Sequence, residues 1–257
     1  MTSRFLRLQF LLLAASTIPV CAQNFTIDYE SIPATNGFHR IISRNAGAPS
    51  DYYTTLSNFD MTVTSATGTT ASMAGNDYVA FCASQLYPAP SKTADYTITL
   101  TGDDLSYIVN GVDYWDSYRY EKFGALKDVY ATFSDQLLSM DKSSTAYADL
   151  VGALTMATWE IIADYNGTSS SLNLNSGRNI MFNMNWTSIS SGGLYDYYVQ
   201  AKNAAGTGVG ADFQLYGGHS DTPGQDFVFF AVPEPSSMLL VATTGMLGLF
   251  RRSRRQD

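Results

Sequence analysis

The chain has 257 residues, of which 45% are hydrophobic, and 15 basic residues face 23 acidic ones, for a net charge of −8 at pH 7. This acidic balance disfavours nucleic-acid partners, because the phosphate backbone repels an acidic surface. The 17 tyrosines and 14 phenylalanines exclude a disordered chain and supply enough apolar surface for a compact domain.

Residues 1–22 predict a cleaved secretory signal peptide. Two arginines precede an apolar stretch over residues 8–20, and Ala22 supplies the small residue expected at the cleavage site. A lipoprotein signal is the alternative, but it needs a small residue before Cys21, where Val20 stands. We therefore expect an exported chain.

Strand patterns dominate the extracytoplasmic domain expected over residues 23–231. From Phe25 to about Val109, apolar residues alternate with threonine, serine and asparagine, and turn residues bound each run. Strand patterning returns after residue 172, in SLNLNS, NIMFNMNW, LYDYYVQA, ADFQLYG and QDFVFFAV. We expect a mainly β domain of the α+β class, built as a β-sandwich or a barrel-like body with a two-helix insertion.

The helical insertion is expected over about residues 118–163. Apolar residues recur there at three- and four-residue steps as far as Leu137, and the break DKSST separates this helix from a second one over about residues 146–163. The second helix is apolar nearly all round and contains Trp159. We expect it to be the buried centre of the domain, with Trp159 as a structural residue.

Three features follow one another in the last 26 residues. The sequence VPEPS comes first, and its two prolines end the folded domain, since proline continues neither a strand nor a helix interior. The uncharged run over residues 238–250 would be about 20 Å long as a helix, which is short for a hydrocarbon core of about 30 Å. The arginines that follow favour the cytoplasmic side of a membrane.

This order resembles the PEP-CTERM sorting signal of Gram-negative bacteria, with the motif at 232–236, a transmembrane helix at about 236–250 and a basic tail at 251–255. The resemblance implies transient anchoring in the inner membrane, cleavage by an exosortase after export by the secretion machinery, and delivery to the cell surface or an exopolysaccharide-rich matrix. An ordinary tail anchor, the alternative, lacks the Pro-Glu-Pro. The residues expected to carry sorting and processing are Val232, Pro233, Glu234, Pro235, Ser236, Arg251 and Arg252.

Removal of both ends makes the remaining domain more acidic. Residues 1–22 and 233–257 contain six of the 15 basic residues but only two of the 23 acidic ones, so the net charge becomes −12. Such a surface could attract cations. The DYNGT turn that begins at Asp164, however, lacks the oxygen spacing of a calcium-binding EF-hand loop.

Two further segments, AFCASQLYP around Cys82 and ALTMATWEIIADYNG in the second helix, resemble the two halves of the thioester domain of bacterial surface adhesins. In that family a cysteine thiol and a helix glutamine condense to an internal thioester. Cys82 and Trp159 match, but Thr155 stands in place of the glutamine and has no carbonyl group to bond to sulfur. We therefore expect an inactive thioester-like fold with a role in adhesion or biofilm formation. The alternative is an active adhesin that uses Cys82 and Gln85.

Other catalytic and metal-binding patterns are weak. His39 and His219 are far apart in the sequence, and a Ser-His-Asp set built on His219 and Asp221 lacks a nucleophile elbow. The histidines and Cys82 show no metal-ligand spacing, and Glu160 is expected to cap or pair locally beside Trp159. We expect no enzymatic activity, no cofactor and no metal site.

A carbohydrate-binding β module is the remaining alternative. Tyr195, Tyr197 and Tyr198 in YDYYV could stack on sugar rings if they lay exposed on a strand. Alternate tyrosines of a strand are more often one buried and one exposed. The first hypothesis therefore remains a surface-delivered protein without catalysis.

Overall fold

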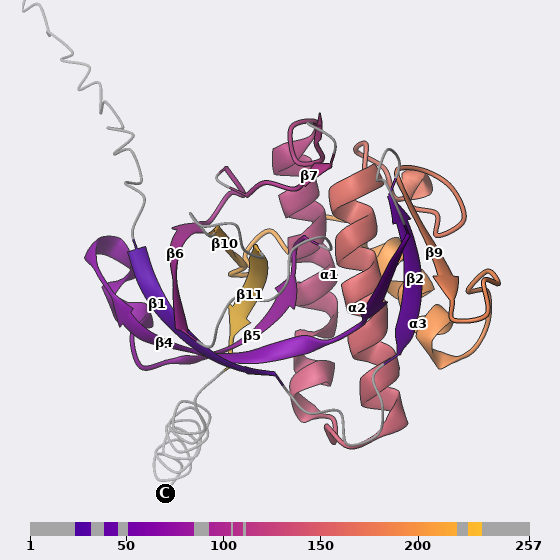
Figure 1. Ribbon diagram of the computed structural model, residues 1–257. Helices are drawn as coiled ribbons and strands as arrows, with labels where there is room; N and C mark the ends of the chain where they lie inside the picture. Colours follow the sequence, from indigo (N-terminus) through magenta and orange to yellow (C-terminus); the bar gives the residue numbers. More distant parts are fainter. Residues whose placement is uncertain are drawn as a thin grey trace, which may run out of the picture.

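The computed structural model describes residues 24–31, 39–45, 51–84, 93–103, 105–109, 112–219 and 226–232. They form a six-stranded barrel, a layer of helices and a separate three-stranded sheet (Figure 1). Within these residues, no helix combines the length and the apolar character needed to cross a bilayer. The predicted signal peptide and the predicted transmembrane helix lie outside them.

The barrel closes in the order β1-β4-β5-β11-β10-β6, and each neighbouring pair is antiparallel. Its strands are β1 (Asn24–Ser31), β4 (Asn58–Ala66), β5 (Asp77–Cys82), β6 (Thr93–Thr99), β10 (Tyr216–His219) and β11 (Phe227–Ala231). The 3-10 helix η1 (Gly68–Met73) follows β4. The first and last described strands thus belong to one closed sheet.

Two neighbouring strands of the barrel, β5 and β11, are buried along nearly their whole length. Side chains of a strand alternate between its two faces. Phe227 packs its ring 5.4 Å from that of Phe59 on one face, whereas Phe81 lies 5.0 Å from Tyr130 of the helical layer on the other. These strands are therefore apolar on both sides, because one face lines the barrel and the other meets the helices.

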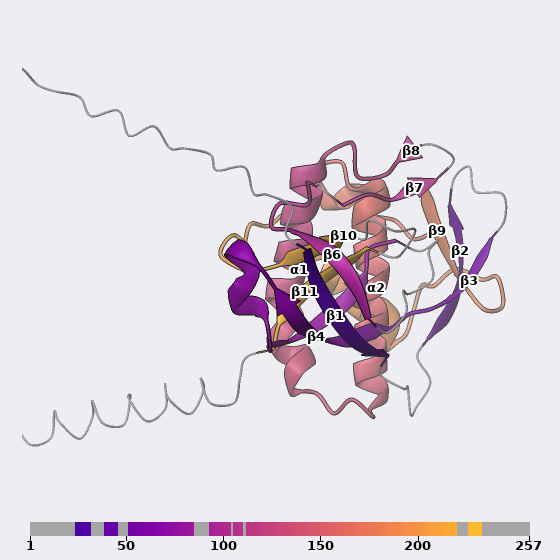
Figure 2. The ribbon, with the colours of Figure 1, turned by 60° about the vertical axis from the view of Figure 1, so that its left-hand side comes forward.

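The helical layer consists of α1 (Arg119–Ser139), α2 (Thr145–Asp164) and α3 (Gly193–Ala204). The Ser144 side chain caps α2 by accepting a hydrogen bond from the Tyr147 N–H over 3.1 Å. Nearly all of α2 is buried, since it lies between the barrel and the small sheet, with α1 and α3 beside it (Figures 1 and 2). The prediction of a central buried second helix is confirmed.

The small sheet has the order β3-β2-β9, with β2 (Arg40–Asn45), β3 (Tyr52–Thr55) and β9 (Asn179–Asn183). It joins a strand that follows α2 to two strands that precede β4, so segments from before and after the two long helices meet there. A two-stranded hairpin, β7 (Ile108–Val109) and β8 (Val112–Asp113), and the 3-10 helix η2 (Ser169–Ser171) complete the described elements.

The α+β class, the barrel-like body and the two predicted helices are confirmed, but three predicted strands are wrong. LYDYYVQA lies in α3, SLNLNS forms the end of η2 and a turn, and ADFQLYG becomes a strand only at its end. In α3 the buried residues Tyr198 and Ala201 lie one turn apart, which is a helical and not a strand spacing. Gly152 permits this packing: a Cβ atom there would lie 2.7 Å from Leu194 Cδ1.

Candidate functional site

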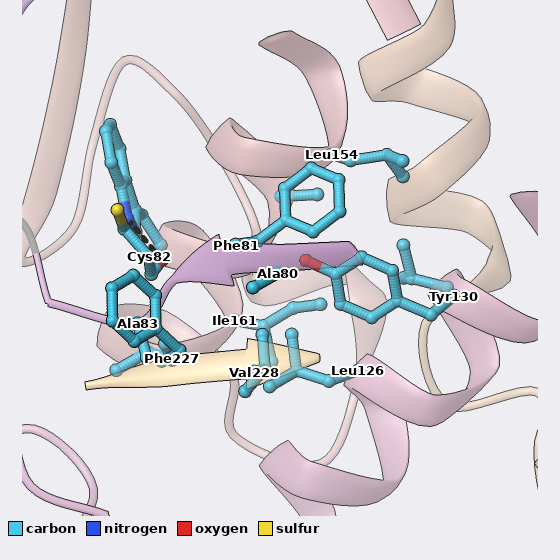
Figure 3. Close-up of a cluster of buried hydrophobic side chains, with 14 of the residues drawn as sticks. Ala80, Phe81, Cys82, Ala83, Leu126, Tyr130, Leu154, Ile161, Phe227 and Val228 are labelled. Atoms are coloured by element: carbon cyan, nitrogen blue, oxygen red, sulfur yellow. Dashed lines mark hydrogen bonds between the residues drawn. The ribbon is translucent and has the colours of Figure 1, made fainter. Parts of the chain in front are cut away.

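Cys82 ends β5 beside α2 and is buried (Figure 3). The indole Nε1 of Trp159 donates a hydrogen bond to the Cys82 carbonyl oxygen over 2.9 Å, the dashed line in Figure 3. Burial raises the pKa of the Cys82 thiol far above its ordinary range. The sulfur therefore stays protonated near neutral pH, and a thiol is a poor nucleophile compared with a thiolate.

Thr155 lies one turn before Trp159 on the same face of α2. Its Oγ1 atom is 3.4 Å from the carbonyl oxygen of Ser57, the residue that precedes β4. Because β4 pairs with β5, this face of α2 packs on the adjoining ends of both strands. The structure thus brings Thr155, Trp159 and Cys82 to one end of this strand pair.

The chemistry of this region is limited by the threonine. The Thr155 hydroxyl donates to the Val151 carbonyl oxygen over 2.8 Å, and both Thr155 and Cys82 are buried. A hydroxyl group offers no acyl carbon, so it forms no thioester with a cysteine. Gln85, the other candidate acyl donor, lies outside the described residues.

Glu160, the residue after Trp159, is fully buried. Its Oε2 atom accepts a hydrogen bond from the backbone N–H of Asn173 over 3.0 Å. Burial, and then the charge of Asp164, raise the pKa of Glu160 well above its ordinary value. The carboxyl group therefore links α2 to the segment after η2, across 13 residues, and the expected local pairing is wrong.

The two histidines pair with aspartates in separate parts of the fold. His39 Nε2 is 2.5 Å from Asp149 Oδ1, and His219 Nδ1 is 3.0 Å from Asp226 Oδ1. Asp221, the partner considered for His219, lies outside the described residues. Among the residues with described positions, no three histidine, cysteine, aspartate or glutamate side chains are grouped as metal ligands.

The three tyrosines considered for sugar binding do not form an exposed strand face. All three lie in α3, where Tyr198 is buried and Tyr195 and Tyr197 pack partly against the core. A sugar-stacking row on a strand is therefore excluded at these positions.

An exposed aromatic group, which the sequence does not identify, lies instead on the small sheet. The Trp186 cluster consists of Tyr53, Phe182 and Trp186, whose side chains come from β3, β9 and the turn after β9. The Trp186 ring centroid lies 6.5 Å from that of Tyr53 and 6.0 Å from that of Phe182. Tyr53 is 59% exposed and Trp186 is 47% exposed. In the sequence, NIMFNMNW has the alternation of a strand and gives no sign of which face is open.

Comparison with protein families identifies the C-terminal segment. Residues 231–255 match the model described as the PEP-CTERM protein-sorting motif. The chain carries a PEP-CTERM sorting motif. This motif implies processing by an exosortase, export, and a location at the cell surface or outside the cell.

Comparisons of the whole chain do not identify a family. No curated protein sequence matches it. Among solved structures, the N-terminal domain of the Streptococcus pyogenes pilus tip adhesin Cpa is similar over 79% of this chain and 99% of that one, with 11% identity and a TM-score of 0.38. A similarity at this level carries no argument about function or about any residue.

The PEP-CTERM motif begins where the barrel ends. Val232 donates its backbone N–H to the Asp77 carbonyl oxygen over 2.9 Å, so it extends the pairing of β11 with β5 by one residue. The other predicted sorting residues, from Pro233 to Arg252, lie outside the described residues.

Proposed function

We propose that this protein is exported from a Gram-negative bacterium and released by an exosortase to the cell surface or matrix, where it serves in adhesion or biofilm formation without catalysis. The PEP-CTERM motif at residues 231–255 carries this proposal. Before processing, the apolar run at about 236–250 would anchor the chain in the inner membrane. Exopolysaccharide or another matrix component is the expected partner.

The surroundings of Cys82 support a role without covalent chemistry. The thiol is buried with a raised pKa, and the helix position one turn before Trp159 is a threonine. An active thioester through Gln85 has less support, because Gln85 lacks the flanking glycines that would permit a tight Cys-x-x-Gln turn.

The sorting step is tested by replacing Pro233, Glu234 and Pro235 with alanine in the producing bacterium. The variant should remain at full length in the inner membrane, whereas the wild type should be released in a shortened form. Unchanged release of a shortened product would overturn the sorting role.

The adhesion role is tested in a strain that lacks the gene. Loss of the gene should reduce surface attachment, and the wild type and Cys82→Ala should restore it equally. Attachment that does not depend on the gene would contradict the adhesion role, and restoration only by the wild type would point to a chemical role for the thiol.

The inactive thiol is tested by mass spectrometry. A thioester between a cysteine and a glutamine forms with loss of one ammonia, and methylamine opens it by attacking the acyl carbon and freeing the thiol. The wild-type protein should keep its full mass, take up no methylamine and expose one free thiol on denaturation. Thr155→Gln restores the acyl donor, and loss of one ammonia would show that strand and helix still face each other as in the thioester family. Methylamine uptake by the wild type would overturn the inactive assignment.

A further inference from the structure

The outer face of the small sheet carries a row of side chains that crosses all three strands. Ile42 of β2 is the register partner of Tyr53 on β3 and of Phe182 on β9. Directly opposite residues of antiparallel strands point to the same face. Ile41 and Ser43, one residue to either side of Ile42, point to the other face, toward α2, and are buried.

Ile42 is fully buried although it lies on the outer face. Neighbouring side chains on that face must therefore cover it, and its two cross-strand partners are aromatic. Tyr53 and Phe182 of the Trp186 cluster thus flank a buried isoleucine side chain. The outward sides of the Tyr53 and Trp186 rings remain exposed to solvent.

Trp186 adopts a left-handed backbone conformation, with φ at 61°. For a bulky residue this conformation is unfavourable and persists only where the surroundings enforce it. Asn183 enforces it here: its Oδ1 atom accepts the backbone N–H groups of Asn185 and Thr187 over 2.9 Å and 3.1 Å. The strained turn thus places an indole ring in solvent, and backbone strain of this kind is common at binding sites.

Arg44 extends this surface, and Asp51 balances its charge. Its guanidinium carbon lies 5.6 Å from the Phe182 ring centroid and 6.0 Å from that of Trp186. The same guanidinium donates to Asp51 over 2.7 Å and 3.2 Å, a two-pronged ion pair. The cluster therefore combines aromatic faces with hydrogen-bonding groups whose charges already cancel.

A cleft of about 260 Å³ lies where β9 ends, and its lining includes Asn183, the residue after Phe182. Its polar lining includes Arg40, Ser188 and Ser190, together with the paired side chains of His39 and Asp149. Sites for drug-sized ligands measure roughly 300–1,000 Å³, so this cleft alone is too small for an extended ligand. None of the three aromatic residues of the Trp186 cluster belongs to the lining of this cleft, so the exposed rings themselves provide the contact area of the proposed site.

We propose that the Trp186 cluster binds a neutral saccharide. The C–H face of a pyranose ring carries a slight positive charge and is attracted to the negative face of an aromatic ring. Arg44, Asp51 and Asn183 supply donors and acceptors for the sugar hydroxyl groups. The Arg44 guanidinium is already paired with Asp51, and the domain has a net charge of −12, which repels anionic ligands, so an uncharged ligand suits this surface. This site is separate from Cys82 and stands whether or not the adhesion proposal holds.

Tryptophan fluorescence provides a direct test on the protein secreted by the producing bacterium. Of the three tryptophans, Trp115 and Trp159 are buried and Trp186 is 47% exposed, so the neutral quencher acrylamide reports on Trp186. The probes are neutral oligosaccharides of glucose, mannose, galactose and N-acetylglucosamine. At least one should protect Trp186 from acrylamide, and its affinity should not depend on salt.

Matched variants separate stacking from folding. Because Trp186 is itself the reporter, binding by the variants is measured by isothermal titration calorimetry, and Trp186→Ala should weaken it roughly tenfold or more, in line with the loss of one stacked ring. Trp186→Tyr keeps an aromatic face and should retain most of the affinity. Tyr120→Ala removes a more exposed aromatic ring, from α1, and should leave binding unchanged.

Three outcomes would overturn the proposal. The first is that none of the neutral saccharides protects Trp186. The second is that Trp186→Ala binds as tightly as the wild type. The third is a dimer in solution that Trp186→Ala dissociates, which would make this face a contact between two copies of the chain.

Discussion

Trp159 and Trp186 are the same amino acid in opposite settings. Trp159 lies on a regular turn of α2, is 3% exposed, and donates its indole N–H to the Cys82 carbonyl oxygen. Trp186 follows β9 in a left-handed conformation and is 47% exposed. The Trp159 indole has its ring buried and its N–H group hydrogen-bonded inside the fold. The Trp186 indole is half exposed, and its backbone adopts an unfavourable conformation.

The difference separates the part of this molecule that resembles a chemical site from the part that is open to a ligand. Around Trp159 the thiol is protonated and buried, and the nearby hydroxyl of Thr155 is bound within its own helix. Around Trp186 the aromatic faces are accessible and polar groups surround them. Recognition is therefore expected on the small sheet, and stability on α2.

Replacing Trp159 should have the largest effect. Trp159→Ala removes a buried aromatic ring and leaves the Cys82 carbonyl oxygen without its donor, at a cost of about 3–5 kcal/mol in the free energy of unfolding. Thermal or urea unfolding of the secreted protein measures this loss. Trp159→Phe keeps most of the packing and should lose about 1 kcal/mol, which isolates the hydrogen bond. A Trp159→Ala protein as stable as the wild type would contradict the central position of α2.

The position of Trp159 could be predicted because local and tertiary preferences agree there. α2 is apolar on all sides, so its sequence requires burial all round, and its predicted bounds differ from the observed ones by one residue at each end. In α3 the two preferences disagree. The tyrosines of LYDYYVQA favour a strand locally, but burial of Tyr198 and Ala201 against the neighbouring elements selects a helix.

Of the two candidate regions, the one around Cys82 could be predicted from the sequence and the Trp186 cluster could not. The approach of Thr155 to the Cys82 end of the barrel could be predicted from two matching motifs, since each places its residue on one known element. The Trp186 cluster could not, because it depends on the pairing of β3, β2 and β9, which join residues more than 120 positions apart. A single sequence contains alternation but no register, and register decides which rings share a face.

Glu160 offers a second way to test how closed the surroundings of Trp159 are. Its raised pKa means that the folded protein keeps a proton that the unfolded chain loses above about pH 4.5. The free energy of unfolding should therefore fall as the pH rises from there through the folded pKa. Glu160→Gln removes this titration, so it should change stability little at about pH 4 and stabilise the protein at about pH 7.

Denaturant unfolding at the two pH values measures the effect of Glu160→Gln, and Glu121→Gln is the matched control, since it removes an exposed carboxylate from α1. Burial and then Asp164 raise the pKa of Glu160, and the backbone N–H of Asn173 and then Lys202 lower it. Parallel pH profiles for the wild type and Glu160→Gln would mean that this carboxyl group is charged in the folded protein, and that the interior of α2 is less closed than its burial indicates.

Replacing Trp186 should have the smallest effect on stability, and the reason sharpens the contrast with Trp159. Trp186→Asn relieves the left-handed strain, because asparagine tolerates this conformation, but it also removes the ring that packs on Phe182 and Arg44. Each contribution is about 1 kcal/mol and the two oppose each other, so the free energy of unfolding should change by less than about 1 kcal/mol. The same substitution should weaken saccharide binding measured by isothermal titration calorimetry, which does not depend on the fluorescence of Trp186. A loss of stability comparable to that of Trp159→Ala would instead make Trp186 part of the structural core, and the strain at φ 61° would then serve folding and not binding.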